Sequence, residues 1–156
     1  MDTQVVFIEL SVPRKNRYVC DITEKLFAQG KTIQIFAGRK DVVLQLSRDL
    51  WVWKPDSFIP HGVYFGGPQE PLFEEEPVVV TTKLLPRRSH VLILYDALPI
   101  DDELKGFDLI VDFAEIYEKQ KHLESRNRYK AFRDAQGFEV QFSKIGAFLR
   151  EKSLSS

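Results

Sequence analysis

Short apolar runs alternate along this chain with segments whose apolar residues recur at helical spacing, and this alternation restricts the fold more than any other feature. Helices are predicted over 16–29, 41–50 and 117–135. Strands are predicted at 5–8, 32–37, 62–65, 78–81, 91–94 and 109–111. Because most of these runs are almost continuously apolar, they are typical of strands covered on both faces. The order of the elements predicts a three-layer α/β domain with a mixed, largely parallel sheet.

The composition is that of an ordinary globular protein and narrows the possible functions. The 156 residues favour one domain over 1–156, with residues 143–156 interpreted as a C-terminal extension. A formal net charge of -1 argues against a protein that coats nucleic acid by bulk electrostatics. Cys20 is the only cysteine and is interpreted as a buried, reduced thiol of a cytoplasmic protein. We expect no signal peptide and no membrane span, because the first apolar run is too short and no basic region precedes it.

No motif for catalysis, cofactor binding or metal binding occurs at the required spacing. The Gly-Lys-Thr at 30–32 resembles the end of a phosphate-binding loop, but it lacks the earlier glycine and lies between a helix and a strand. Gly30 is therefore interpreted as a helix C-cap. The chain has no Gly-x-Ser-x-Gly elbow, and His61, His90 and His122 lie far apart. We expect no cofactor, no metal and no active site, and we interpret His61 as a turn or packing residue.

The last long predicted helix concentrates positive charge. Between Tyr117 and Gln136 six bases accompany three acids, a local charge of +3, so the rest of the chain sums to -4. The spacing i, i+3, i+4 and i+7 places four residues on one helical face: Arg126, Tyr129, Lys130 and Arg133. Guanidinium groups around an aromatic ring suit a short peptide that carries carboxylates and an aromatic side chain. An ordinary solvated helix surface would have the same pattern, so both interpretations stay open here.

A second feature is an aromatic segment at the end of the second predicted helix. Trp51, Trp53 and Phe58 lie there beside a loop punctuated by prolines. Exposed aromatic side chains of this kind anchor protein interfaces, but the same residues could equally close the bottom of the core. The Pro- and Gly-rich stretch 55–77 is too long for a simple connector, and such loops are often functional.

These two segments resemble one protein family, the chi subunit of the bacterial DNA polymerase III holoenzyme. The segment LWVWKPDSFIPHG at 50–62 resembles the part of chi that joins its second helix to the sheet. The segment RNRYKAFRDAQGF at 126–138 resembles the last long helix of that family, and HVLILYDA and LIVDFAE correspond to its late strands. The resemblance extends over about Val5 to Phe142. The loop 62–77, Trp53 and the chain after Phe142 depart from the family pattern.

The resemblance implies a Rossmann-like fold without nucleotide chemistry and a non-catalytic adaptor in the clamp-loader assembly that serves DNA replication. Members bind the psi subunit and the acidic, Phe-ended C-terminal tail of single-stranded-DNA-binding protein. Trp51 and Phe58 correspond to a separate surface that meets psi or a helicase. The residues that correspond to the tail site are Arg126, Tyr129, Lys130 and Arg133, with Ala114 near its wall.

Two other interpretations are open from the sequence alone. The first is a nucleotide-dependent or hydrolytic α/β enzyme with a degenerate motif, which the lack of a phosphate loop, a triad or a metal cluster disfavours. A thermal-shift assay with nucleotides and divalent metals would separate it from an adaptor. The second is direct DNA binding, which the weak net charge disfavours although the basic helix keeps it open. We expect DNA to be met mainly through the partners.

Overall fold

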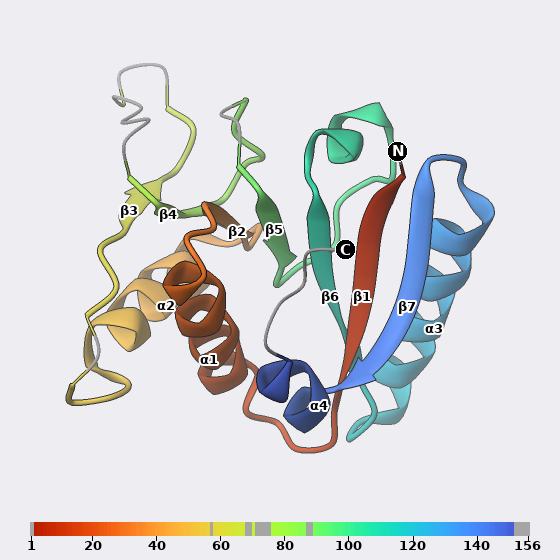
Figure 1. Cartoon of the computed structure of the whole chain (residues 1–156), viewed down its shortest axis with the longest axis horizontal. Helices are drawn as coiled ribbons and strands as arrows, with labels where there is room; N and C mark the ends of the chain where they lie inside the picture. Colours follow the sequence, from red (N-terminus) through yellow and green to blue (C-terminus); the bar gives the residue numbers. More distant parts are fainter. Residues whose placement is uncertain (1, 57, 68–69, 71–75, 87–88, 152–156) are drawn as a thin grey trace.

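The strands form a single sheet in the computed structural model, which describes residues 2–56, 58–67, 70, 76–86 and 89–151. Its order is β3-β4-β2-β5-β6-β1-β7 (Figure 1). The strands are β1 (Thr3–Leu10), β2 (Ile33–Phe36), β3 (Gly62–Tyr64), β4 (Val78–Thr81), β5 (Val91–Leu94), β6 (Leu109–Glu115) and β7 (Phe138–Lys144). The predicted three-layer α/β class is confirmed. Every described pairing is parallel, so in these residues the sheet is not mixed.

Helices cover the sheet on both faces (Figure 1). The helices α1 (Lys15–Ala28), α2 (Lys40–Val52) and α4 (Ile145–Arg150) lie on one face, and α3 (Lys119–Asp134) lies on the other. A short 3-10 helix, η1 (Asp102–Gly106), precedes β6. Gly30 follows α1 with a φ of 78°, a left-handed conformation that glycine adopts easily, so its predicted place at the helix end is confirmed.

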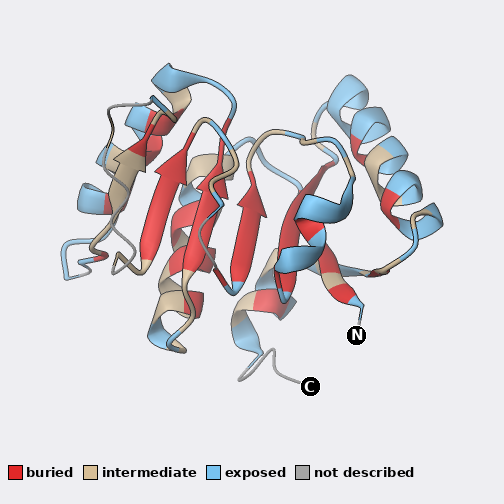
Figure 2. Ribbon diagram, turned by 90° about the horizontal axis from the view of Figure 1, so that it is seen from above, coloured by how far each residue is buried: buried red, intermediate tan, exposed pale blue. Residues whose placement is uncertain are grey.

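Alternating side chains divide the core into two layers. Val6, Ile8 and Leu10 of β1 point toward α1, α2 and α4, whereas Val5 and Phe7 point toward α3. The central strands are buried on both faces, as Figure 2 shows in red. Cys20 belongs to the first layer, and its burial raises the pKa of the thiol to about 12, as expected for a packing residue.

The chain after β6 continues the fold on both faces. β7 adds an edge strand beside β1, and α4 then places Phe148 in the first core layer with 1% of its surface exposed. Residues 143–150, which the sequence analysis assigned to an extension, therefore form the end of β7 and a helix packed on the core. In the part of the chain that the structure describes, no helix is long and apolar enough to cross a membrane.

Candidate functional site

Helix α3 is fixed at its start and along its buried side. The Glu118 carboxylate caps the first turn by accepting hydrogen bonds from the backbone N–H groups of Gln120 (2.9 Å) and Lys121 (3.2 Å). Phe132 is 1% exposed, and its ring packs edge-on against Phe7 at a centroid distance of 6.0 Å. The cap fixes the first turn and the packing against β1 fixes the buried side, so the helix presents its outer side chains on a rigid support.

The four residues predicted to share a face do so on one uninterrupted helix. Arg126, Lys130 and Arg133 are exposed, whereas Tyr129 is half-buried. The Tyr129 ring lies edge-on against Phe7, with the two centroids 5.3 Å apart. The face therefore consists of three exposed cations next to an aromatic ring that is fixed against the core; we call these four residues the α3 face.

The cations of the α3 face are available for a ligand. Within the described residues, the side chains of Arg126 and Lys130 form neither an ion pair nor a hydrogen bond. Arg133 is 3.3 Å from the carboxylate of the adjacent Asp134, and both side chains are more than half exposed. An exposed pair of this kind contributes little free energy, so an incoming carboxylate can replace it.

Arg128 has a different role from its neighbours. Its Nε donates to Asp112 Oδ2 at 3.0 Å, and its Nη2 donates to Asp112 Oδ1 and to the Phe113 carbonyl, both at 3.1 Å. Asp112 is 2% exposed. Burial raises the pKa of the Asp112 carboxyl, and the Arg128 guanidinium opposes that shift. One of the six bases counted in the helix is therefore neutralised by an acid from β6, which the local count of +3 did not include.

The sequence analysis missed an aromatic residue beside the α3 face. Phe142 of β7 pairs in register with Phe7 and shares a side of the strand with Phe138 and Val140, which pack in the layer under α3. Its side chain is nevertheless 51% exposed. Phe142 thus extends the apolar surface that begins at Tyr129. The alternation of Phe138, Val140 and Phe142 was the available signal.

Ala114 lies on the sheet beneath α3. It belongs to β6, is 8% exposed, and shares a side of the strand with Ile110 and Asp112. The backbone N–H of Glu115 donates to Ser125 Oγ of α3 at 3.2 Å, so the helix covers this part of β6. The structure therefore brings Ala114 to the correct side of the sheet but leaves little of it accessible.

The aromatic segment forms a separate exposed surface at the end of α2. Trp51 is 45% exposed and Phe58 is 67% exposed, so the prediction that both leave apolar surface accessible is confirmed. Their ring centroids are 5.0 Å apart, and Trp51 also lies 4.5 Å from His61. Trp53 is different, because it packs partly buried against the core. α2 and α3 lie on opposite faces of the sheet, which separates this surface from the α3 face (Figure 1).

His61 supports the Trp51 ring and is itself held by two contacts. Its Nε2 lies 2.8 Å from Ser47 Oγ, and its Nδ1 lies 2.9 Å from the Ile59 carbonyl. Burial lowers the pKa of the imidazole, which favours the neutral form. These contacts agree with the packing role predicted for this residue. Across the described residues, no group of three or more His, Cys, Asp or Glu side chains is placed to hold a metal ion.

Comparison with known proteins gives one consistent match. The family model described as "DNA polymerase III chi subunit, HolC" matches residues 2–141. The DNA polymerase III subunit chi of Escherichia coli (strain K12) is 30% identical over 124 residues, which cover 78% of this chain and 80% of that protein. The match includes the α3 face and the aromatic segment, the same two segments that carried the resemblance in the sequence.

Proposed function

The chain belongs to the family of DNA polymerase III chi subunits, which are accessory subunits of a replicative polymerase, and on this basis we propose that it is a non-catalytic cytoplasmic adaptor of the clamp-loader assembly. In this proposal the α3 face binds the acidic, Phe-ended C-terminal tail of single-stranded-DNA-binding protein. The surface formed by Trp51 and Phe58 binds a psi-type subunit or a helicase. DNA is reached mainly through these partners.

One observation carries the tail assignment: a fixed aromatic ring lies among cations that have little else to bind. Tyr129 is held against Phe7, while Arg126 and Lys130 have no partner within the described part of the chain. A solvated helix surface does not require an aromatic ring beside its cations. A peptide that carries carboxylates and ends in Phe requires such a ring in its binding site, because the Phe side chain needs apolar area next to the groups that hold the carboxylates.

The contacts of such a complex follow from the positions of the side chains. Arg126 and Arg133, about two turns apart on α3, would hold tail carboxylates, and the terminal Phe ring would lie beside Tyr129 and Phe142. Charge-assisted hydrogen bonds contribute roughly 1.5–3 kcal/mol each, before the cost of ordering the tail. Because the cations are exposed, affinity is expected to be modest and to fall with salt.

The test is a fluorescence titration of a labelled tail peptide against the wild-type chain and Arg126→Ala, at low and high salt. We expect Arg126→Ala to weaken binding by about tenfold or more, which corresponds to roughly 1.4 kcal/mol. Lys121→Ala is the matched control, because it removes the same charge from the same helix about 140° around the axis. Equal binding by wild type and Arg126→Ala would reject the site, and no binding by either would reject the tail-binding function.

The second surface is tested separately. Trp51→Ala is expected to reduce capture of a psi-type subunit by at least tenfold, because large aromatic anchors dominate interface energies. The same variant should bind the tail peptide as wild type does, since α2, which carries Trp51, and α3 lie on opposite faces of the sheet (Figure 1). Unchanged capture of psi and of helicase partners by Trp51→Ala would remove this part of the proposal.

A further inference from the structure

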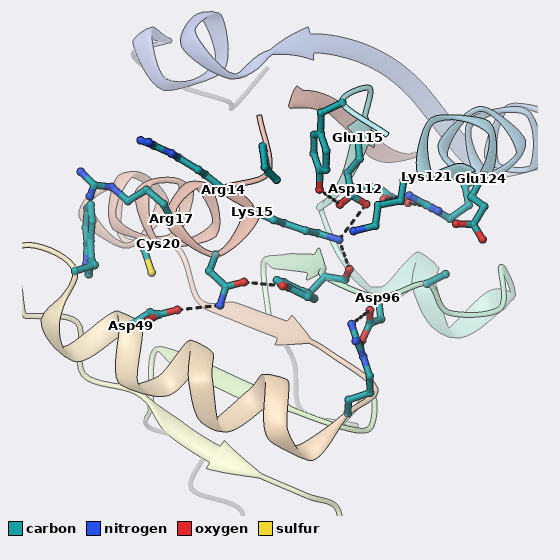
Figure 3. Close-up of a pocket in the computed structure, with 18 of the residues that line it drawn as sticks. Arg14, Lys15, Arg17, Cys20, Asp49, Asp96, Asp112, Glu115, Lys121 and Glu124 are labelled. Atoms are coloured by element: carbon teal, nitrogen blue, oxygen red, sulfur yellow. Dashed lines mark hydrogen bonds and ion pairs between the residues drawn. The ribbon is translucent and has the colours of Figure 1, made fainter. Parts of the chain in front are cut away.

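A pocket of about 990 Å³ opens at the carboxyl ends of the central strands; most of the residues that line it are charged or polar, and none of them belongs to the α3 face. The segments that follow β1, β5 and β6 contribute to it, as do α1 and α3 (Figure 3). From β1 the chain crosses one face of the sheet through α1, and from β6 it crosses the other face through α3. The pocket therefore lies at a topological switch point, the place where open α/β sheets bind ligands.

A buried ionic network forms the floor of the pocket. The Lys15 ammonium donates to the Tyr95 carbonyl and lies 3.4 Å from Glu115 Oε2, with only 13% of its side chain exposed. Glu115 also accepts a hydrogen bond from Tyr117 Oη at 2.6 Å. Arg128 and Asp112 form a second pair of a cation and a carboxylate beside Lys15 and Glu115. Such buried pairs seldom increase stability over apolar packing, so their presence favours a role in binding.

The pocket retains donors that the network does not use. Lys15 uses two of the three hydrogens of its ammonium group, which leaves one for a ligand. Lys121 lines the pocket from α3 and, within the described residues, forms no ion pair or hydrogen bond through its ammonium group. Figure 3 shows Lys15 and Lys121 entering the same space from α1 and α3. Two ammonium groups from opposite layers therefore converge on one part of the pocket.

The pocket also offers acceptors whose charge is already compensated. Asp112 is paired with Arg128, Glu115 with Lys15, and Asp96 with Arg39 at 2.9 Å. A carboxylate has about four lone-pair positions, so Glu115 and Asp96 can each accept a further hydrogen bond, whereas Asp112 is buried and already accepts from Arg128 and from the Phe113 backbone N–H. A carboxylate that is paired with a cation can still accept a hydrogen bond from a hydroxyl group. It repels a nearby anion less strongly than an unpaired carboxylate does.

We propose that this pocket binds a small phosphate monoester that carries hydroxyl groups, of the class of a nucleoside monophosphate. Lys15 and Lys121 hold the phosphate, and the compensated carboxylates accept the sugar hydroxyls. Tyr95 and Tyr117 supply aromatic walls. The connection from β1 to α1, Ser-Val-Pro-Arg at 11–14, contains no glycine, so its backbone cannot approach a diphosphate as a dinucleotide-binding loop does. The connection at 11–14 is therefore compatible with a phosphate monoester that is held by side chains.

The test is isothermal titration calorimetry of the full chain with AMP, ribose 5-phosphate, adenosine and inorganic phosphate. We expect saturable binding of AMP and ribose 5-phosphate, weaker binding of inorganic phosphate, and little binding of adenosine. Lys121→Ala should weaken AMP binding about tenfold, the loss expected for one charge-assisted hydrogen bond. Lys15→Met should do the same, with its fold checked by circular dichroism; if that variant does not fold, Lys121→Ala decides the matter.

Arg126→Ala separates this pocket from the tail site. It removes a cation from the other side of α3 and should leave AMP binding unchanged, whereas it weakens binding of the tail peptide. Absence of saturable AMP binding at millimolar concentration would overturn the proposal. Equal AMP affinity in wild type and Lys121→Ala would overturn it as well, as would equal losses in Arg126→Ala and Lys121→Ala. None of these results would alter the tail titration, so the two proposals fail independently.

Discussion

Two arginines that lie two residues apart on α3 illustrate how environment determines the role of a side chain. Arg126 and Arg128 point to nearly opposite sides of the helix, because each residue turns the chain by about 100°. Arg128 reaches a buried carboxylate, Asp112, and is committed to the fold. Arg126 reaches solvent and remains available to a partner. We therefore expect Arg128→Ala to affect stability and Arg126→Ala to affect partner binding.

Arg128→Ala should lower the free energy of unfolding by about 3–5 kcal/mol at neutral pH, because it leaves the Asp112 charge buried and unpaired. Arg126→Ala is the control and should change stability by less than about 0.5 kcal/mol. Urea denaturation of both variants by circular dichroism measures the difference. Similar stabilities of Arg128→Ala and Arg126→Ala at pH 7 would show that the Arg128–Asp112 pair does not support the fold.

The stability loss in Arg128→Ala should depend on pH in a specific direction. Burial raises the pKa of Asp112, and removal of Arg128 removes the opposing influence. Between the ordinary pKa and the raised one, the folded variant holds a proton that the unfolded chain has released, so its stability falls as pH rises through that window. The difference from wild type should be largest near pH 7 and should shrink toward acid pH. A difference that grows as pH falls from 7 toward 4 would contradict this assignment.

At the scale of elements, β7 and α4 combine structural and functional roles in neighbouring residues. Phe148 of α4 is buried in the core, whereas Phe142 of β7 is half-exposed beside the α3 face. The same substitution at the two positions therefore separates packing from binding.

Phe148→Ala should lower the free energy of unfolding by about 3–5 kcal/mol, as expected for a large side chain removed from a core. Phe142→Ala should cost less than about 1 kcal/mol of stability and should weaken tail binding, because it removes apolar area beside Tyr129. Chemical denaturation and the tail titration, run on both variants, measure these effects. Normal tail binding by Phe142→Ala would exclude this residue from the site.

The sequence predicted all the strands and α-helices up to α3 but missed the last two elements, for physical reasons. β4 and β5 have the predicted bounds, because strands buried on both faces leave an almost unbroken apolar run. β7 and α4 were not predicted: β7 is an edge strand with mostly exposed side chains, and α4 has only six residues. The α3 face followed from helical spacing, which is local. The role of Arg128 could not be predicted from helical spacing, because its partner Asp112 lies on β6, 16 positions earlier in the chain.

At the scale of the whole molecule, α2, which carries Trp51, and α3, which carries the α3 face, lie on opposite faces of one sheet (Figure 1). One surface, at the end of α2, is apolar; the other, on α3, is basic and has the Tyr129 ring beside its cations. An adaptor needs such a separation, because it must hold two partners at once without competition. The near-neutral net charge agrees with this, since the segment around α3 carries a local charge of +3 while the rest of the chain sums to -4.

The two surfaces should bind independently of each other. A psi-type subunit bound at Trp51 and Phe58 is expected to change the affinity for the tail peptide by less than about twofold, since no element carries residues of both surfaces. Raising salt from 50 to 500 mM should weaken tail binding severalfold and should affect the apolar surface much less. Titration of the tail peptide with and without psi measures the coupling. Competition between the two partners would contradict an adaptor with separate sites.

The most direct test of the central claim is to map the tail on the protein itself. A ¹⁵N-labelled chain is titrated with the acidic, Phe-ended peptide and followed by two-dimensional NMR. We expect saturable shifts that cluster at residues 126–133 of α3 and 138–142 of β7, with none at 51–61. Shifts that cluster at the aromatic segment or at the pocket beside Lys15, or no shifts at all, would contradict it.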